Sequence, residues 1–544
     1  MVLLSSCDKS LEEDLLQAPK TYYINSENGS DNNDGQSKNS AWKSISKIND
    51  ITLKPGDQIL LANGKVYSEP IVIQNMNGTA ALPILISSYM PSDETSQKKP
   101  FLDVKDALNG IKIIDCSHLQ IENLEISVNP SSSSTSSSSK TMRCGVLIEP
   151  YKNGVSQDIE LNNLTIKNVF YEKPGFVRPS NEVKSPNGTQ NYGWGIRVIN
   201  KNENATKDIK IKNTHVENVA HTGIKFTGKE RNIQNVLVEK CTIIESGGPG
   251  LQMSNIKNGH ILNNYVTHSG SNNDGRKWGR GSGLWTWGSA DVLIEKNHFL
   301  NANGPADSAG AHIDFNCENI VMQYNVSANN AGGFIEILGN NYNCSYRYNL
   351  SVNDGHRVKG QNGAFQEGKV FWLSGFQGNG NARKGPFNSY IYNNTIVVKA
   401  DILAKIAVDK AASGILVMNN IFYVEGESQL VLGDQYVPDS GGISTIENVV
   451  FENNLYLKNN NWPETVLIQD ENPIFGDPKF SVGNGLKIEN YQPTNIELIQ
   501  NKGKQIIKIP SDNIGLTLGL TLSSDILGNP IKGLPDMGAI EIGN

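Results

Sequence analysis

Short β-type runs recur along the chain, and most of them end at an asparagine. Between Asn213 and Asn349 these runs follow one another at steps of about 23 to 33 residues, which is too irregular for a coiled coil and too short for propeller blades. The repeat predicts a parallel solenoid, in which each strand pairs with its equivalent one rung away at about 4.8 Å. We expect the repeated asparagines to form a hydrogen-bonded ladder at one corner. They are Asn123, Asn163, Asn213, Asn264, Asn297, Asn325, Asn349, Asn394, Asn420 and Asn454, with Cys241 in the same slot.

A second set of strands in the same rungs begins after glycine. Residues one, three and five positions after each glycine are mainly apolar and should point inward, so the second and fourth should point outward. The aligned glycines are Gly195, Gly223, Gly250, Gly283, Gly310 and Gly332. We align the last rung on Gly332 because an alignment on Gly333 would bury Glu336. The outward +2 row is then Arg197, Lys225, Gln252, Trp285, His312 and Phe334, and the +4 row is Ile199, Thr227, Ser254, Trp287, Asp314 and Glu336.

The remaining segments divide the chain around this solenoid. Residues 20–60 read as a strand, a polar loop, a short amphipathic helix and another strand, which suits a cap on an open end. Insertions of residues 170–192 and 271–282 are long enough to be functional loops, and the serine run at 130–140 is low in complexity. The expected units are 1–19 as a signal remnant and tether, 20–110 as the cap and first rungs, 111–460 as the central coil with its active face, and 461–544 as the last rungs and cap.

Composition excludes several classes of protein. The 544 residues carry a formal net charge of -7, so the basic footprint of a nucleic-acid-binding protein is absent. No run approaches the roughly 18 apolar residues that span a bilayer. The cysteines show neither a disulfide framework nor the spacing of a zinc site. We expect a monomer with a carbohydrate partner and no nucleic-acid partner.

The first residues bear on localisation. The segment from Met1 to Cys7 resembles the end of a bacterial lipoprotein signal, with Leu4 three residues before Cys7 and small residues between them. The resemblance implies a lipid on Cys7 and a place at the cell surface or in the periplasm, on the outer membrane. The apolar stretch is short for a complete signal, which leaves a chance match as the alternative.

Several motifs identify a family. The segments YYINSENGSDNNDG, AWKSISKI and LKPGDQILL, the rungs that end in asparagine, and the closing DMGAIE resemble secreted bacterial proteins of the pectate-lyase-like superfamily. The resemblance implies an all-β, right-handed parallel β-helix with an N-terminal cap and inserted loops. This superfamily contains polysaccharide lyases, glycoside hydrolases, esterases, epimerases and phage adhesins, so the site has to decide the function.

Two carboxylates are the strongest candidates for catalysis. Asp314 and Glu336 are 22 residues apart, and both take the +4 position. Stacked on adjacent strands, they would lie roughly 5 Å apart, as in retaining glycosidases. The pair resembles that of the β-helix glycoside hydrolases, including the β-xylosidase family, and this resemblance implies Asp314 as nucleophile and Glu336 as acid/base. A calcium-binding or merely solvent-facing pair is the alternative.

Neighbouring residues supply candidates for substrate binding. Two exposed indoles, Trp285 and Trp287, would suit the C–H face of a sugar, with packing beneath residues 271–282 as the alternative. His312 and Gln252 share the outward face, whereas Arg197 and Lys225 at its far end fit solvated surface better. Glu367, Asp307 and the pair His356-Arg357 flank the same rungs as a further carboxylate or a cation and rank second. Lys277 and Arg280 lie in a glycine-rich loop that would cover the groove; loop solubility explains them equally well.

A retaining glycoside hydrolase without a cofactor is therefore the predicted function. A lyase would need a base, which His312, Lys277 or Arg280 could supply, and calcium held by Asp314, Glu336 and Glu367. The outward rows lack the dense basic column that a polyuronate groove favours. A non-catalytic glycan-binding protein is the third alternative; it would keep the tryptophans and tolerate loss of either acid.

Overall fold

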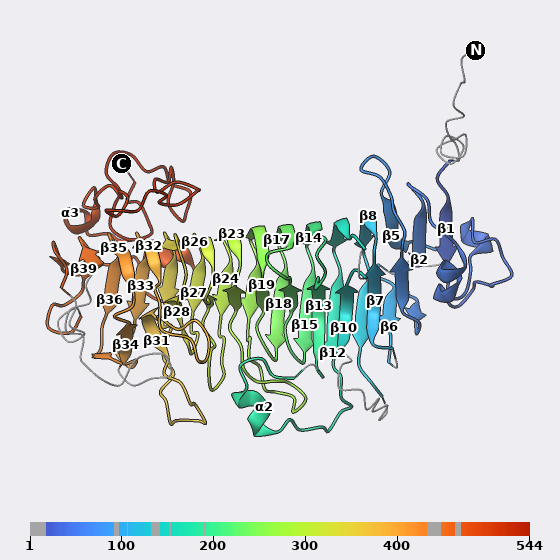
Figure 1. The fold of residues 1–544 in the computed structure, drawn as a ribbon, viewed down its shortest axis with the longest axis horizontal. Helices are drawn as coiled ribbons and strands as arrows, with labels where there is room; N and C mark the ends of the chain where they lie inside the picture. The colour runs from blue at the N-terminus through green and yellow to red at the C-terminus, as the bar shows by residue number, and fades with distance from the viewer. Residues whose placement is uncertain are drawn as a thin grey trace, which may run out of the picture.

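The fold is a single long coil of parallel strands. The computed structural model describes residues 18–91, 97–105, 107–131, 142–151, 154–189, 191–431, 448–462 and 469–543. Successive rungs stack along the long axis from the N-terminal to the C-terminal end (Figure 1), and a view along that axis shows the walls of the coil. A central rung contributes one strand to each of three sheets, which contain 14, 14 and 12 strands in the described residues, and neighbouring strands within each sheet are parallel. The all-β parallel β-helix predicted from the sequence is confirmed.

The three sheets are named here in the order in which a rung visits them. The first sheet is β1 (Thr21–Ile24), β2 (Gln58–Ala62), β5 (Ile84–Tyr89), β8 (Ser117–Glu122), β11 (Gln157–Asn162), β14 (Thr206–Lys212), β17 (Ile233–Glu239), β20 (Ile256–Leu262), β23 (Ala290–Glu295), β26 (Glu318–Gln323), β29 (Ser345–Arg347), β32 (Phe387–Tyr392), β35 (Ser413–Met418) and β38 (Val449–Glu452). The second sheet is β3 (Val66–Tyr67), β6 (Phe101–Asp103), β9 (Glu125–Val128), β12 (Thr165–Val169), β15 (His215–Val219), β18 (Thr242–Ser246), β21 (Tyr265–Thr267), β24 (His298–Leu300), β27 (Val326–Ala328), β30 (Leu350–Val352), β33 (Thr395–Val398), β36 (Ile421–Val424), β39 (Leu455–Tyr456) and β40 (Ile474–Phe475). The third sheet is β4 (Ile71–Gln74), β7 (Asn109–Ile114), β10 (Arg143–Ile148), β13 (Gly193–Ile199), β16 (Ile224–Thr227), β19 (Leu251–Ser254), β22 (Leu284–Trp287), β25 (Ala311–Ile313), β28 (Gly333–Ile337), β31 (Lys369–Leu373), β34 (Ala404–Val408) and β37 (Ser428–Leu430).

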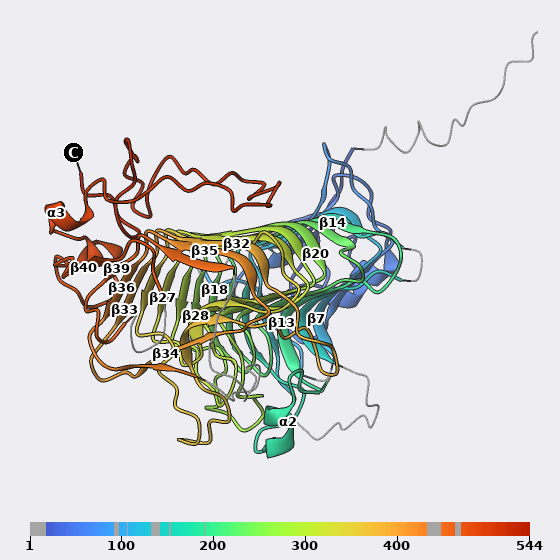
Figure 2. The same ribbon diagram turned by 60° about the vertical axis from the view of Figure 1, so that its left-hand side comes forward.

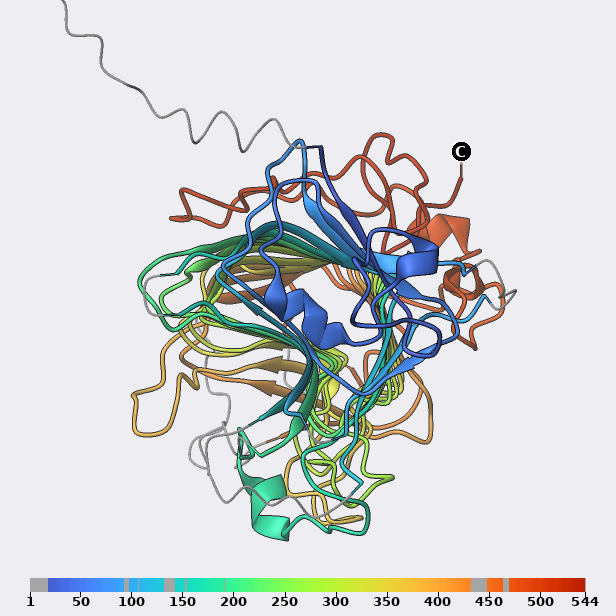
Figure 3. The same cartoon turned by 90° about the vertical axis from the view of Figure 1, so that its right-hand side faces the viewer.

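Helices are short and lie outside the rungs. They are the 3₁₀ helices η1 (Lys38–Ser40), η2 (Ile45–Asp50) and η4 (Ile488–Tyr491) and the α-helices α2 (Ser180–Lys184) and α3 (Ile496–Ile499). Helix η2 inserts Ile45 and Ile48 into the core at the N-terminal end of the coil, which Figure 3 shows in blue. Residues 20–60 thus contain a strand, a loop, short helices and a second strand in the predicted order, and η2 covers the end of the core.

Buried asparagines stabilise the corner between the first and second sheets. Asn325 is fully buried, and its Oδ1 accepts from the backbone and side chain of Asn297, both at 3.0 Å. Its Nδ2 donates to the carbonyl of Ile294 at 2.9 Å and to Oδ1 of Asn349 at 3.0 Å. The same pattern makes one continuous ladder of Asn264, Asn297, Asn325, Asn349, Asn394, Asn420 and Asn454.

The first three predicted members lie outside the buried ladder, although Asn163 Nδ2 donates to Asn123 Oδ1 at 2.8 Å in the neighbouring row. Asn123, Asn163 and Asn213 lie one position earlier in the rung, with φ of 60°, 50° and 50°, a left-handed backbone that asparagine tolerates. The buried slot of those rungs holds Leu124, Leu164 and Thr214. Cys241 does occupy the slot, and its N–H donates to Asn264 Oδ1 at 2.9 Å.

The C-terminal segment runs back over the first sheet, as the red chain in Figure 2 shows. Tyr324 and Tyr392 donate from their hydroxyls to the carbonyls of Ser524 and Leu520, both at 2.7 Å. This segment covers the first sheet, whereas the outer face of the third sheet is framed by loops. The five described cysteines are buried and form no disulfide. None of the helices in the described ranges combines the length and the apolar character needed to cross a bilayer. Cys7 and the serine run from Ser132 onward lie outside the described residues, so lipidation stays a prediction.

We predict that Asn325→Ala lowers the free energy of unfolding by about 3 kcal/mol or more. The substitution leaves two buried donors of Asn297 and one buried carbonyl without their hydrogen-bond partner. The exposed Asn181, in α2, provides the matched control, and Asn181→Ala should stay within about 0.5 kcal/mol of wild type. Urea-induced unfolding followed by circular dichroism measures both. Equal losses in the two variants would contradict a stabilising ladder.

Candidate active site

A pocket of about 450 Å³ opens on the outer face of the third sheet. Strands β16, β19, β22, β25, β28 and β31 form its floor, and loop residues around Pro186, Arg280, Asp307 and Arg357 form its walls. This volume lies within the usual range for sites that hold small molecules. A wider hollow of about 620 Å³ lies between the first sheet and the C-terminal segment, and it contains neither a tryptophan nor a glutamate.

The strand register sets one row of outward side chains along the floor. Lys225, Gln252, Trp285 and His312 lie level with one another on adjacent strands, as predicted. Ile313 pairs with Ile337, so His312 lies level with Glu336, and Glu336 is in turn level with Trp372. The floor row is Lys225, Gln252, Trp285, His312, Glu336 and Trp372.

The predicted stacking of Asp314 on Glu336 is therefore wrong. Asp314 is level with Leu338, because the slot of Gly310 is filled in the next rung by Phe334 and not by Gly332. The two carboxylates are diagonal neighbours, one strand apart and two residues along, which corresponds to about 8 Å between their Cα atoms. Both nevertheless line the same pocket. The level stacking from which a retaining pair was inferred therefore does not exist between these two residues.

Asp307 is the ionised carboxylate of the pocket. Burial by itself would raise its pKa, but the guanidinium of Arg280 outweighs this effect and lowers the pKa of Asp307 below its ordinary value. Arg280 Nε donates to Asp307 Oδ2 at 2.7 Å, and both side chains are almost entirely buried. The Asp307 backbone N–H donates to Oε1 of Gln366 at 2.8 Å, and Arg357 Nη1 donates to the Asp307 carbonyl at 2.9 Å. These contacts fix a charged group at the wall of the pocket.

Asp314 and Glu336 have the opposite character. Burial, with a further contribution from the charge of Asp307, raises the pKa of Asp314 to about 7, although the N–H of Phe315 donates to its Oδ1 at 2.9 Å. Burial also raises the pKa of Glu336; the nearby ammonium of Lys369 opposes the shift, whereas Asp307 and Asp314 reinforce it. Among these three carboxyl groups of the pocket, burial favours the protonated form of Asp314 and Glu336, whereas Arg280 favours the ionised form of Asp307.

The histidine and the two tryptophans predicted on the floor are uncharged. Burial lowers the pKa of His312 to about 4, so its ring is neutral, and Nδ1 lies 3.2 Å from Ser282 Oγ. Trp285 packs edge-on against His312, with ring centroids 5.7 Å apart, and Trp287 packs in the same way against Phe315 at 5.9 Å. Gln252 and both tryptophans line the pocket as predicted.

Of the predicted flanking residues, some line the pocket and one lies behind it. Arg280 and Glu367 line the pocket, although Arg280 is committed to Asp307 and Glu367 pairs with Lys405 at 3.1 Å. Lys277 is predicted wrongly as a substrate contact. Its ammonium is buried away from the pocket and donates to the carbonyl of Glu245 at 2.7 Å and to Asn273 Oδ1 at 2.8 Å.

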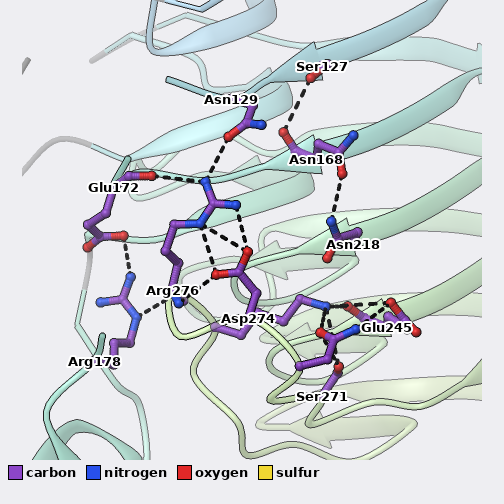
Figure 4. A network of polar contacts seen from close by, with 12 residues as sticks. Ser127, Asn129, Asn168, Glu172, Arg178, Asn218, Glu245, Ser271, Asp274 and Arg276 are labelled. Carbon is purple, nitrogen blue, oxygen red and sulfur yellow. Dashed lines mark hydrogen bonds and ion pairs between the residues drawn. The ribbon is translucent and has the colours of Figure 1, made fainter. Parts of the chain in front are cut away.

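Two insertions form one wall of the pocket through buried arginines. Arg178 donates to the carbonyl of Arg276 at 2.8 Å, and Arg276 bridges Asp274, Asn129 and Glu172, as Figure 4 shows. Trp278 Nε1 donates to the carbonyl of Glu182 at 2.8 Å. The insertions of residues 170–192 and 271–282 are thereby held together beside the third sheet.

The sequence analysis missed Trp372 as a pocket residue and ranked Asp307 and Lys225 too low. Trp372 follows Gly368 at the spacing by which Glu336 follows Gly332, a run that the sequence analysis did not include, and its register with Glu336 places it in the floor row. Asp307 lies in a loop without a period, and its role depends on Arg280. Lys225 was expected on solvated surface, but it is partly buried and lines the pocket, and its neighbour Arg197 is 5% exposed.

A calcium site of the predicted composition is not formed. Within the described part of the chain, no three His, Cys, Asp or Glu side chains gather as a metal ion would require. Asp314, Glu336 and Glu367 line one pocket, but Glu367 is engaged by Lys405 and by the backbone N–H of Lys359.

Known proteins share this fold. Residues 194–369 match the family described as "Right handed beta helix region", which agrees with the predicted hand of the coil. The chain is 24% identical to a lacto-N-biosidase of Bifidobacterium longum subsp. longum over 96% of this chain and 36% of that protein, so it spans about a third of this relative. The crystal structure of a GH136 lacto-N-biosidase from Eubacterium ramulus superposes with a TM-score of 0.55 at 20% identity, covering 76% of this chain and 68% of that one. The A-module of a mannuronan C-5 epimerase from Azotobacter vinelandii gives a TM-score of 0.44 at 11% identity, covering 71% and 91%.

We predict that Asp314→Asn changes how stability depends on pH. The unfolded aspartate loses its proton near pH 4 and the folded one at about 7, so Asp314 lowers the stability of the wild type as the pH rises between these values. Over about three pH units this amounts to roughly 4 kcal/mol. The free energy of unfolding of the variant, relative to that of the wild type, should therefore increase by up to that amount between pH 4 and pH 8.

The measurement is the free energy of unfolding in urea at several pH values. Asp50→Asn, at a side chain 64% exposed, is the control and should give a curve parallel to that of wild type. A parallel curve for Asp314→Asn as well would show that the pKa of Asp314 is not raised.

Proposed function

We propose that the protein is a glycoside hydrolase that cleaves a glycosidic bond in this pocket. The observation that carries the proposal is the divergence of two pKa values within one cavity: that of Asp307 is lowered and that of Asp314 is raised to about 7. A pair of carboxyl groups in opposite protonation states is what acid and base or nucleophile roles require at one pH.

The roles follow from these charges. Asp314, still protonated near neutral pH, is positioned to protonate the oxygen of the leaving group. Asp307, ionised and fixed by Arg280, is the carboxylate that faces the positive charge developing at the anomeric carbon. This division differs from the one that the family resemblance implied, in which Asp314 was the nucleophile. Glu336, also protonated, supplies a hydrogen-bond donor between them and the ammonium of Lys369.

The pocket also offers apolar surfaces suited to a sugar. Trp285 and Trp372 lie in the floor row on either side of His312 and Glu336, and Trp287 lies on the floor beside Trp285. Indole faces pack well on the C–H faces of pyranose rings because both are apolar. Distant similarity to lacto-N-biosidases over almost the whole chain supports hydrolysis of an oligosaccharide and brings lacto-N-biosides among the substrates to be tried.

We predict that Asp307→Asn and Asp314→Asn each lower kcat by about 10³-fold, because each removes one of the two complementary groups. Asp208→Asn, on the first sheet, is the control and should keep wild-type activity. Aryl glycosides with good leaving groups need less protonation, so Asp314→Asn should lose much less activity on them than Asp307→Asn does.

The assay uses a panel of aryl glycosides, lacto-N-biosides and plant oligosaccharides, with detection of reducing ends and of unsaturated uronates. Wild-type kcat should fall as the pH rises through about 7, when Asp314 loses its proton. Products that carry an unsaturated uronate would show a lyase and overturn the proposal, as would full activity in both asparagine variants.

We further propose a double displacement with retention, in which Asp307 forms the covalent intermediate. In Asp307→Gly, azide should enter the vacated space and restore turnover of an activated aryl glycoside as a glycosyl azide. Proton NMR of the first product of wild-type hydrolysis should show the configuration of the substrate. A first product of inverted configuration would show that Asp307 acts as a base on water and not as a nucleophile.

A further inference from the structure

Lys225 is a cation of the pocket for which the described residues provide no counter-ion. Lys225, on β16, begins the floor row and lines the pocket with Thr227, Gln252 and Ser254. Across the described ranges, no carboxylate or hydrogen-bond acceptor engages its ammonium group. The two other cations of the pocket wall, Arg280 and Arg357, are both held by protein oxygens.

The surroundings of Lys225 add positive charge. Arg197 lies level with it on the adjacent strand β13, and its guanidinium stacks over Trp194 at 4.3 Å. Burial, together with Arg197, lowers the pKa of Lys225 to about 7. A partly buried ammonium group beside a second cation is unfavourable without a counter-charge, so this end of the pocket carries a positive potential.

The strand register places Lys225 far from Asp314 and Glu336. Lys225 is separated from the strand of Asp314 by three strand steps, about 14 Å, and from Glu336 by four. No carboxyl group contributes to the pKa shift of Lys225. The cation is thus placed away from the reacting bond, where it can contact a different part of a long substrate.

We propose that Lys225 forms an anion subsite, which binds an acidic substituent of the glycan, a carboxylate or a sulfate, on a sugar removed from the cleaved bond. The inference rests on the proposed function and specifies its substrate as an acidic oligosaccharide. Thr227, Gln252 and Ser254 offer neutral hydrogen-bonding groups beside the ammonium. An arriving anion supplies the counter-charge that the protein lacks, and a charge-assisted hydrogen bond in a dry pocket is strong.

The test compares matched pairs of oligosaccharides that differ only in one substituent: neutral against sialylated, uronate-bearing or sulfated. We expect wild-type kcat/KM to be at least 10-fold higher for the acidic member of at least one pair. A preference seen with the sialylated or uronate-bearing pairs identifies a carboxylate as the bound group, and a preference seen with the sulfated pairs identifies a sulfate. Lys225→Met should abolish the preference by lowering kcat/KM at least 10-fold more for the acidic member than for the neutral one, and Lys225→Arg should retain the preference.

Lys207→Met, at an exposed lysine on β14, is the matched control and should keep the preference. Equal loss on both members of a pair in Lys225→Met, or a wild-type preference for the neutral member, would overturn the anion subsite while hydrolysis stands.

Binding separates this inference from the proposed function. Titration calorimetry with the Asp307→Asn chain measures affinity for the same pairs without turnover. If no glycan is hydrolysed but acidic members still bind more tightly through Lys225, the hydrolase proposal fails and the subsite stands. Formation of an unsaturated uronate that requires Lys225 would identify the lysine as a base and overturn both.

Discussion

Parallel pairing between successive rungs is the constraint on which the rest of this structure depends. Each strand of the third sheet hydrogen-bonds to the next, so a side chain that points outward in one rung must stand beside its equivalent in the next. The buried asparagine ladder maintains this register, because a shifted rung would leave amides such as that of Asn325 without partners. The floor row from Lys225 to Trp372 is a consequence of this register.

Burial then determines the electrostatics of the site. The insertions of residues 170–192 and 271–282 rise beside the third sheet and remove its outward side chains from water. In that setting Asp307 keeps its charge because Arg280 is bonded to it, whereas Asp314 has only the N–H of Phe315. The same depth therefore yields opposite protonation states for two carboxyl groups seven residues apart in sequence.

The sequence was informative wherever a period existed and misleading where it broke. Glycines from Gly195 to Gly310 place the floor residues correctly, because a Cβ at positions such as Gly223 would meet the carbonyl of the next rung. The break comes at β28, where Phe334 takes the glycine slot and moves Glu336 into the row of His312. The ladder failed by one position for Asn123 because neighbouring slots in a turn both accept asparagine. The position of Lys277 depends on partners far away in sequence, which no repeat reveals.

The charged groups are distributed unevenly along the floor, so the two ends of the pocket differ. Its unpaired cation lies at Lys225, its tryptophans lie in the middle and at the β31 end, and its carboxyl groups lie at the level of β25 and β28. A neutral glycan could lie along such a row in either sense, because indole faces and amides do not distinguish its ends. A glycan with one acidic substituent could not, since the substituent gains a counter-charge only at Lys225. That contact would fix which bond reaches Asp307 and Asp314, so the charge far from the chemistry selects the bond that is cleaved.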